Sequence, residues 1–419
     1  MKISSCLIAK NEAANIGRCL ESVKSISDEI IVVDTGSTDN TVEIAKSFGA
    51  KVYFYEWDNN FSSAKNYALD KASGDWIIFL DADEYFDAKT RKILVDTLKK
   101  ILDEQEYDAL LCRMINTDGY NGKKLSENPT VRIFRGNRDI RYKGAVHEQL
   151  VKQDKNVKII HMKDLPLIIY HTGYSSNLLP EKTKRNLKIL EDEVKNNIIT
   201  NQTYYHISAM HSNLNNYDEA IRYAMMALEE PTFNDTIFAY KPYTIIINSM
   251  LHLKEKYSFE DINKYIEEAA ERFPYHPEIW YAIGNAYKEY KNYPLAIESY
   301  LKAIECDKNY SSMLNNNFPA YLDGVYNNLA YMSLKIGDKV MALQYYFDSL
   351  KINKYNTGSL RGLYELIKNQ EPEEIVLFFK NIYNMDNKDD LVFLNAVMAD
   401  LGNKVLANYY YVQHERKFS

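Results

Sequence analysis

Two carboxylates, Asp81 and Asp83, lie one residue apart directly after the apolar run at residues 76–80. A short apolar run without alternation predicts a parallel strand that is covered on both faces. In open α/β sheets ligands bind at the carboxyl ends of such strands, so both acids should project into a crevice. Two carboxylates cannot enclose a metal ion alone, but they suit a divalent ion that is shared with substrate phosphates. The alternative is a strand followed by a solvated acidic turn.

Other expected strands also end in polar groups. Residues 3–9 predict a strand that leads into Lys10-Asn11-Glu12, and residues 29–34 predict a strand that ends at Asp34. Short helices are expected between these strands, which is typical of a doubly wound nucleotide-binding fold. Lys65 lies near the start of a helix expected from residue 61, either on the surface or where it could contact a phosphate.

Length, charge and composition narrow the classes of protein. A chain of 419 residues has room for two or three domains. Its net charge of -7 argues against general nucleic-acid binding. Apolar stretches stay well below the roughly 18 residues of a membrane span, and the first residues do not resemble a signal peptide. We therefore expect a cytoplasmic protein without stable membrane insertion, whose four scattered cysteines are free thiols.

The order of these motifs over roughly residues 1–175 resembles a family 2 glycosyltransferase. The resemblance implies a GT-A nucleotide-diphospho-sugar transferase fold, which is Rossmann-like, and inversion at the sugar carbon. It also implies a UDP-sugar donor (UDP-GlcNAc or UDP-Glc), with Mn²⁺ or Mg²⁺ as the metal cofactor. Asp83 becomes the direct metal ligand. The residues implied to bind the donor are Ala9, Asn11, Glu12, Asp34, Gly36, Lys65, Asp81 and Ala82.

An inverting transfer also needs a base on the face opposite the leaving group. Residues 107–175 supply Glu148 as the leading candidate, and Glu84 is held in reserve. His171 is a candidate second metal ligand, and Arg132 or Arg135 could hold phosphate in a bidentate manner. The order of these motifs also resembles the family 2 subset that carries helical repeats, which includes bacteriocin S-glycosyltransferases and flagellin-modifying enzymes. Any of these side chains could instead face solvent.

The second half of the chain has the spacing of helical repeats. The clearest unit matches the tetratricopeptide pattern of large, small and aromatic positions at Trp280, Gly284, Tyr287, Ala296, Tyr300 and Ala303. A weaker copy opens the array at Tyr204, Ala220 and Ala227, and another closes it at Leu394, Ala407 and Tyr411. The alternative is an unrelated helical bundle. Repeat stacks expose a concave face, and a tyrosine-rich face suits an extended peptide acceptor.

These observations predict three parts: a GT-A domain over residues 1–178, a linking helix over 179–200 and a tetratricopeptide-like domain over 201–419. The predicted function is transfer of one sugar to a protein or peptide side chain, with Ser or Thr of a surface protein such as flagellin favoured. The alternatives are Cys of a bacteriocin peptide, a cell-envelope polysaccharide, or a non-enzymatic repeat scaffold with a degenerate nucleotide fold. The repeats are expected to bind the acceptor, and a homodimer through the last repeats is a further hypothesis.

Overall fold

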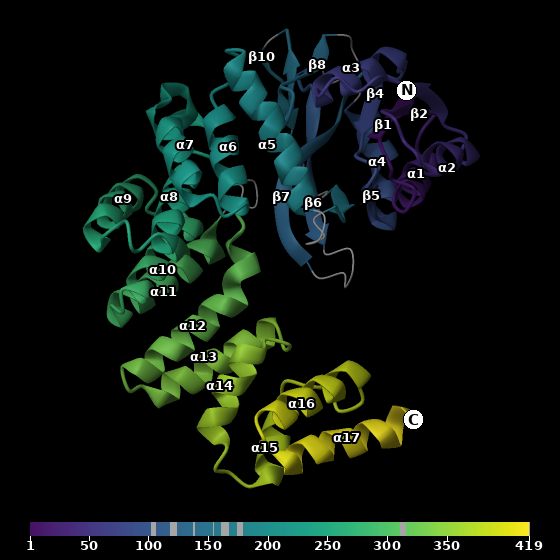
Figure 1. Cartoon of the computed structure of the whole chain (residues 1–419). Helices are drawn as coiled ribbons and strands as arrows, with labels where there is room; N and C mark the ends of the chain where they lie inside the picture. The colour runs from purple at the N-terminus through teal and green to yellow at the C-terminus, as the bar shows by residue number, and fades with distance from the viewer. Residues whose placement is uncertain are drawn as a thin grey trace. The chain divides into compact units, whose positions relative to one another are not determined.

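A computed structural model describes residues 1–101, 106–117, 124–136, 139–153, 155–160, 167–173, 179–310 and 316–418, except the side chains of Leu125, Leu179 and Asp235. Contacts divide the chain into two compact units. The first runs from Met1 to Leu253, and the second comprises Lys254–Tyr310 and the chain from Asn317 onward. Figure 1 shows strands and helices in the first part of the chain and helices alone in the rest.

The first unit is built on a nine-stranded mixed sheet (Figure 1). Its strands follow the order β3-β2-β1-β4-β7-β6-β12-β5, and β11 pairs with β6. The first four strands in this order are parallel to one another, and β7 runs antiparallel to β4 and β6. The strands are β1 (Ile3–Ala9), β2 (Glu29–Asp34), β3 (Lys51–Phe54), β4 (Trp76–Phe79), β5 (Glu84–Phe86), β6 (Ala109–Thr117), β7 (Lys124–Arg135), β11 (Ile159–Ile160) and β12 (Ile168–His171).

Apolar residues of β1 point alternately into two cores, which explains why the strand shows no polar alternation. Leu7 packs with helices α1 (Ile16–Lys24) and α4 (Ala88–Lys100). Cys6, on the other face, packs with helix α3 (Phe61–Lys71). Helix α2 (Thr41–Ser47) connects β2 to β3. Because β2 lies on one side of β1 and β4 on the other, the strand order reverses at β1, the place where α/β sheets bind ligands.

A small antiparallel sheet lies beside α3. It consists of β8 (Ile140–Lys143), β9 (Gln149–Lys152) and β10 (Lys155–Asn156). The side chain of Asn66 on α3 exchanges two hydrogen bonds of 2.9 Å with the backbone of Tyr142 on β8. This pairing fixes β8 against α3, so the connection from β8 to β9 begins at a defined place.

Helices make up the remainder of both units. Those of the first unit are α5 (Leu179–Lys195), α6 (Thr203–Asn213), α7 (Tyr217–Glu229), η1 (Pro231–Asp235) and α8 (Lys241–His252). The second unit contains α9 (Phe259–Arg272), α10 (Pro277–Glu289), α11 (Tyr293–Asn309), η2 (Phe318–Tyr321), α12 (Leu322–Lys335), α13 (Lys339–Ile352), α14 (Thr357–Ile367), α15 (Pro372–Phe379), α16 (Lys388–Asp400) and α17 (Lys404–Phe418). An α/β region followed by helical repeats is the predicted fold class, which is confirmed.

The repeat motif works as its residue types predict. Gly284 of α10 lies against the ring of Tyr300 on α11, and a Cβ atom at Gly284 would come within 2.7 Å of that ring. Tyr300, Ala296 and Ala303 are fully buried. At the closing repeat the prediction was wrong by one position, because Tyr411 is 53% exposed whereas Tyr410 is buried. Residues 409–411 are all tyrosine, so the helical spacing alone does not determine which of the three rings is buried.

The predicted domain boundary differs from the division of the chain into two compact units. The predicted boundary at residue 178 falls at residues 174–178, which lie outside the described residues. By contacts, α5 to α8 group with the α/β region, so the first helical pairs share a unit with the large sheet.

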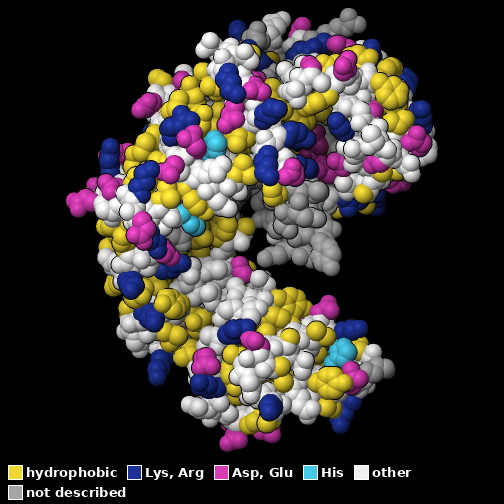
Figure 2. All heavy atoms as spheres, viewed as in Figure 1, with side chains coloured by type: hydrophobic (Ala, Val, Ile, Leu, Met, Phe, Trp, Pro, Cys, Tyr) yellow, Lys and Arg dark blue, Asp and Glu magenta, His cyan; other side chains and the backbone are white. Residues whose placement is uncertain are grey.

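Among the described helices, not one combines the length and apolar character that a membrane crossing requires. Acidic and basic side chains are interspersed on the face shown in Figure 2.

Candidate active site

A cavity of about 810 Å³ opens at the carboxyl ends of β1 and β4, within the first unit. Pockets of roughly 300–1,000 Å³ are the usual size for small-molecule sites. One side, here called the strand-end wall, consists of Ala9, Glu12, Asp81, Asp83 and His171. The other side, here called the helix wall, consists of Lys182, Arg185, Asn186, Gln202, His206 and Phe238. The site therefore combines the sheet with the first helices of the repeat region.

Lys65 lies between the paired acids and the candidate base. Its ammonium is 3.2 Å from Asp81 Oδ1 and also forms an ion pair with Glu148 Oε1. The lysine side chain is only 4% exposed. Burial opposes its charge, but Asp81 and Glu148 outweigh burial and raise the pKa of Lys65. The predicted donor-site lysine is thus a buried cation that joins two predicted site residues.

Arg132 holds a second pair of acids. Its guanidinium donates to both oxygens of Glu84 at 2.8 Å and to Asp81 Oδ2 at 3.1 Å. Burial raises the pKa of Asp81, but the charges of Lys65 and Arg132 outweigh it and hold that pKa well below its usual range. Glu84 is 1% exposed and does not line the cavity, so its geometry disfavours the reserve role as base.

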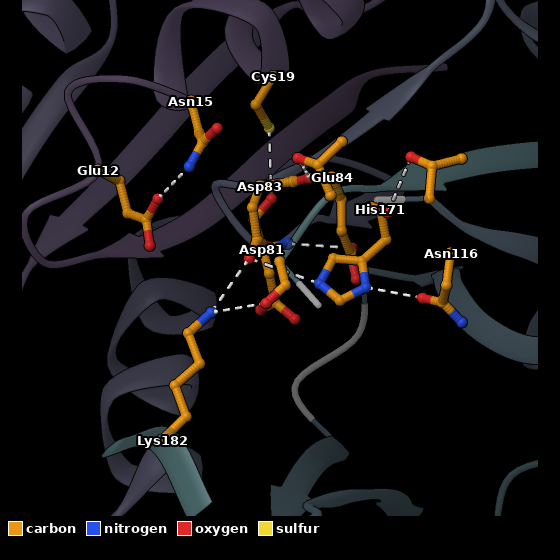
Figure 3. Close-up of polar contacts among 12 residues, drawn as sticks. Glu12, Asn15, Cys19, Asp81, Asp83, Glu84, Asn116, His171 and Lys182 are labelled. Atoms are coloured by element: carbon orange, nitrogen blue, oxygen red, sulfur yellow. Dashed lines mark hydrogen bonds and ion pairs between the residues drawn. The ribbon is translucent and has the colours of Figure 1, made fainter. Parts of the chain in front are cut away.

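Asp83 and His171 both line the cavity and lie next to each other (Figure 3). His171 Nε2 lies 3.4 Å from Asp83 Oδ2, and His171 Nδ1 lies 2.7 Å from Asn116 Oδ1. Because an amide oxygen only accepts, Nδ1 donates to Asn116, and Nε2 hydrogen-bonds to Asp83 Oδ2 in the imidazolium form, in which it also carries a proton. Burial lowers the pKa of His171, but the hydrogen bond and charge of Asp83 outweigh burial and raise it.

A glycine, Gly173, and a cation, Lys182, lie directly beside the pair formed by Asp83 and His171. A Cβ atom at Gly173 would come within 2.0 Å of Asp83 Oδ2 and 2.6 Å of His171 Nε2, so a side chain there would displace the pair. Figure 3 shows Lys182 reaching from α5 toward Asp83, and its ammonium lies 3.5 Å from Asp83 Oδ2. The Lys182 side chain is 40% exposed.

The donor set fits a divalent metal that takes its other ligands from a substrate. A carboxylate and an imidazole face each other, and the imidazole is oriented by an amide in the way metal-bound histidines usually are. The described residues contain no group of three or more His, Cys, Asp or Glu side chains arranged to hold a metal. A site of this kind needs oxygen ligands from phosphate or water, which suits Mg²⁺ or Mn²⁺.

The ends of β1 and β2 form the part of the site predicted for uridine. Asp34 is buried, and its Oδ1 accepts the backbone N–H groups of Gly36 and Ser37 at 3.0 Å. Within the described part of the chain its Oδ2 has no hydrogen-bond partner. Asn11 Oδ1 accepts the backbone N–H of Thr38 at 2.7 Å, so this side chain ties the two strand ends together.

The cavity brings together most of the predicted site residues. Those that line it are Ala9, Glu12, Lys65, Asp81, Ala82, Asp83, Arg132, Glu148 and His171. Asn11, Asp34, Gly36 and Glu84 do not line it. Arg135, the alternative to Arg132, donates to the backbone oxygens of Tyr107 and Ile101 and is not part of the cavity lining.

Sequence reasoning missed the helix wall. Lys182 and Arg185 stand three residues apart near the start of α5, which places them on one helix face. That basic pair directly after the α/β region is the available signal, although the position of the segment between two expected domains predicts a linking helix. His206 of α6 had no local signal, because a histidine at a helical position is usually a packing residue.

Three stretches match known family models. Glycosyl transferase family 2 matches residues 4–148, and tetratricopeptide repeat models match residues 202–230 and 277–310. The SPbeta prophage-derived glycosyltransferase SunS of Bacillus subtilis is 32% identical over 197 residues, covering 46% of this chain and 45% of that protein. A TPR repeat-containing protein of Synechococcus elongatus is 32% identical, covering 43% and 44%. An uncharacterized glycosyltransferase of Rickettsia bellii is 45% identical, covering 27% and 37%.

The matches therefore span less than half the length of these curated relatives. They confirm the GT-A fold class and the repeats that the sequence predicted, including the weaker first copy. Residues 4–148 thus match the glycosyl transferase family 2 model, and stretches that match tetratricopeptide repeat models follow them in the same chain.

Proposed function

We propose that this chain is an inverting, metal-dependent glycosyltransferase that moves one sugar from UDP-GlcNAc or UDP-Glc to a protein or peptide side chain. The observation that carries the proposal is the ion pairing of Lys65 with both Asp81 and Glu148 in one cavity. Lys65 thus connects Asp81, an acid expected at the donor site, to Glu148, the candidate base. A scaffold with a degenerate nucleotide fold has no need of that arrangement.

The donor assignment rests on the strand-end wall. Ala9 and Glu12, at and just beyond the end of β1, line the cavity and would contact uridine. Asp83 and His171 would hold the metal ion, which when bound stabilises the negative charge that develops on the departing diphosphate. Lys182 and Arg185 line the same cavity and add positive charge for phosphate oxygens.

Glu148 performs the proton transfer in this proposal. Its carboxylate takes the proton of the acceptor hydroxyl, and the acceptor oxygen forms a bond to the anomeric carbon of the sugar. The bond from that carbon to the diphosphate oxygen breaks, and UDP leaves with the electron pair. Attack from the face opposite the diphosphate inverts the anomeric carbon. The Glu148 side chain is 14% exposed, so one face of it reaches the cavity.

The favoured acceptor is Ser or Thr of a bacterial surface protein such as flagellin, and the second candidate is Cys of a bacteriocin peptide. Resemblance to the repeat-bearing flagellin-modifying enzymes and bacteriocin S-glycosyltransferases supports both. A polysaccharide acceptor ranks lower, since tetratricopeptide repeats usually bind proteins or peptides. A cytoplasmic location and a homodimer through the last repeats complete the proposal, and light scattering tests the dimer.

The variant Glu148→Gln tests the proposal without a known acceptor. UDP release from UDP-GlcNAc and from UDP-Glc, with water as acceptor and Mn²⁺ present, measures turnover in the full chain. Loss of a general base should slow release by about 10²- to 10⁴-fold. UDP affinity, measured by calorimetry, should stay within about twofold because the uridine side is unchanged.

Glu181→Gln is the matched control, because Glu181 is an exposed glutamate whose side chain is 81% accessible. Its turnover should equal that of the wild type. Undiminished turnover in Glu148→Gln would assign the base to another residue. Absence of any UDP release by the wild type from either donor would favour the scaffold alternative.

A further inference from the structure

The segment from Gly144 to Glu148, which connects β8 to β9, is held from the α3 side at its first residues. Ser62 Oγ donates to the carbonyl of Gly144 at 2.5 Å, and the backbone N–H of Phe61 donates to the carbonyl of Ala145 at 2.9 Å. Both contacts come from the start of α3. They fix where the segment begins, but they lie four and three residues before Glu148.

The same segment is held from the other side by helices α5 and α6. The backbone N–H of Ala145 donates to Glu193 Oε1 on α5 at 3.3 Å. Ala145 and Val146 are buried in one apolar cluster with residues of α5 and α6, namely Leu187, Ile189, Leu190, Ile207 and Met210. The segment that carries the candidate base is therefore packed between the α/β region and α5 with α6.

His147 directly precedes Glu148 in this segment. Its backbone has a φ of 55°, in the left-handed region that residues with side chains seldom adopt. Such a conformation persists where the surroundings determine it. The imidazole of His147 stacks on that of His206 in α6, with ring centroids 3.9 Å apart and an interplanar angle of 13°. Burial lowers the pKa of both imidazoles, and the neighbouring His147 lowers that of His206 further, so neutral rings can stack.

We infer that His206 is a positioning residue for Glu148: by stacking on His147 it fixes the turn that presents the base to Lys65 and to the cavity. This inference rests on the proposed function, in which Glu148 is the base. It makes the first helical pair of the repeat region a part of the reaction site in addition to any role in acceptor binding. A displacement of about 1 Å at a reacting group can cost up to about 10²-fold in rate.

The test compares His206→Ala with His206→Phe in the full chain. Alanine removes the stack, whereas phenylalanine keeps a flat ring against His147 but offers no nitrogen. His206→Ala should release UDP from the sugar donor about 10- to 100-fold more slowly than the wild type. His206→Phe should restore most of that rate, and both variants should bind UDP with wild-type affinity.

The matched control is His252→Ala. His252 stacks on Tyr217 with centroids 4.4 Å apart, so the control removes a similar stack from α8 at a place that does not line the cavity. Its rate should be that of the wild type. Wild-type turnover in His206→Ala would overturn the inference. Equal losses in His206→Ala and His206→Phe would overturn it too, because they would show that a ring nitrogen matters instead of the stack.

A measurement without substrate separates this inference from the proposed function. The imidazole proton resonances of His147 sense the ring current of the stacked neighbour. They should shift in His206→Ala and remain unchanged in His252→Ala. If the wild type releases no UDP, the proposed function fails, while the resonance still reports whether His206 holds His147. An unchanged resonance in His206→Ala would contradict the positioning role.

Discussion

The two walls of the cavity differ in how their residues are held. On the strand-end wall, charged groups hold one another: Asp81 contacts both Lys65 and Arg132, and Asp83 contacts His171. On the helix wall, rings and apolar packing dominate: His206 stacks on His147, and the Arg185 guanidinium lies 5.1 Å from the centre of the Phe61 ring. Changes on the first wall should therefore alter charge and chemistry, and changes at the stacked rings of the second should alter geometry.

The largest effect is expected from Asp83→Ala. Loss of this carboxylate removes one of the two side chains that would hold the metal near the diphosphate. Metal-dependent UDP release should fall by about 10²- to 10³-fold, the usual cost of removing one group that stabilises developing charge. The control Asp96→Ala removes a carboxylate that is 74% exposed and should have no effect. Full activity in Asp83→Ala would remove Asp83 from the metal site.

Lys65→Ala should break the charge network itself. A buried pair that loses one partner typically costs about 3–5 kcal/mol. We expect the low end, about 3 kcal/mol in the free energy of unfolding, because Asp81 keeps Arg132 and is 36% exposed. Denaturant unfolding measures it. Lys184→Ala, which removes an exposed helical pair, should change stability by at most about 0.5 kcal/mol. Equal stabilities would show that the network is not structural.

Asn116→Ala should have a smaller effect on the same wall. Asn116 does not itself line the cavity, but its oxygen orients His171, which does. Loss of such a partner usually costs about 10- to 100-fold in metal affinity. Calorimetric titration of Mn²⁺ in the presence of UDP measures this loss. If Mn²⁺ affinity is unchanged, His171 is not a metal ligand.

The smallest effect concerns the pH dependence of stability on the helix wall. The pKa of His206 is lowered in the folded protein, so the unfolded chain binds its proton more readily. The contribution of His206 to the free energy of unfolding should therefore be fully present above the ordinary histidine pKa of about 6.5, and it should decrease as the pH falls below that value. His206→Phe, which cannot take up a proton there, should lose less stability than the wild type between about pH 6.5 and 5. Parallel pH profiles for both proteins would contradict this.

The sequence predicted the strand-end wall because its signals are local. An apolar run followed by acids determines both a buried strand and the rim at which it ends, as for Asp81 and Asp83 after β4. The repeat glycine at Gly284 was predictable for a similar reason, since Tyr300 follows at a fixed spacing. In each case neighbours in sequence decide the outcome.

The helix wall depends on contacts between distant parts of the chain. His147 and His206 are 59 residues apart in sequence, and neither residue carries a signal for the other. The partners of Lys65 were equally hidden, because Glu148 reaches it only through the connection between β8 and β9. The sequence thus indicated many of the groups that line the cavity, but not which groups hold them in place.

The most direct test of the account is a calorimetric titration of the full chain with UDP, in the presence and absence of Mn²⁺. The proposed donor site predicts UDP binding that strengthens with Mn²⁺ and loses that dependence in Asp83→Ala. No UDP binding with or without metal would contradict the account, because the acids at the strand ends would then form only a solvated rim.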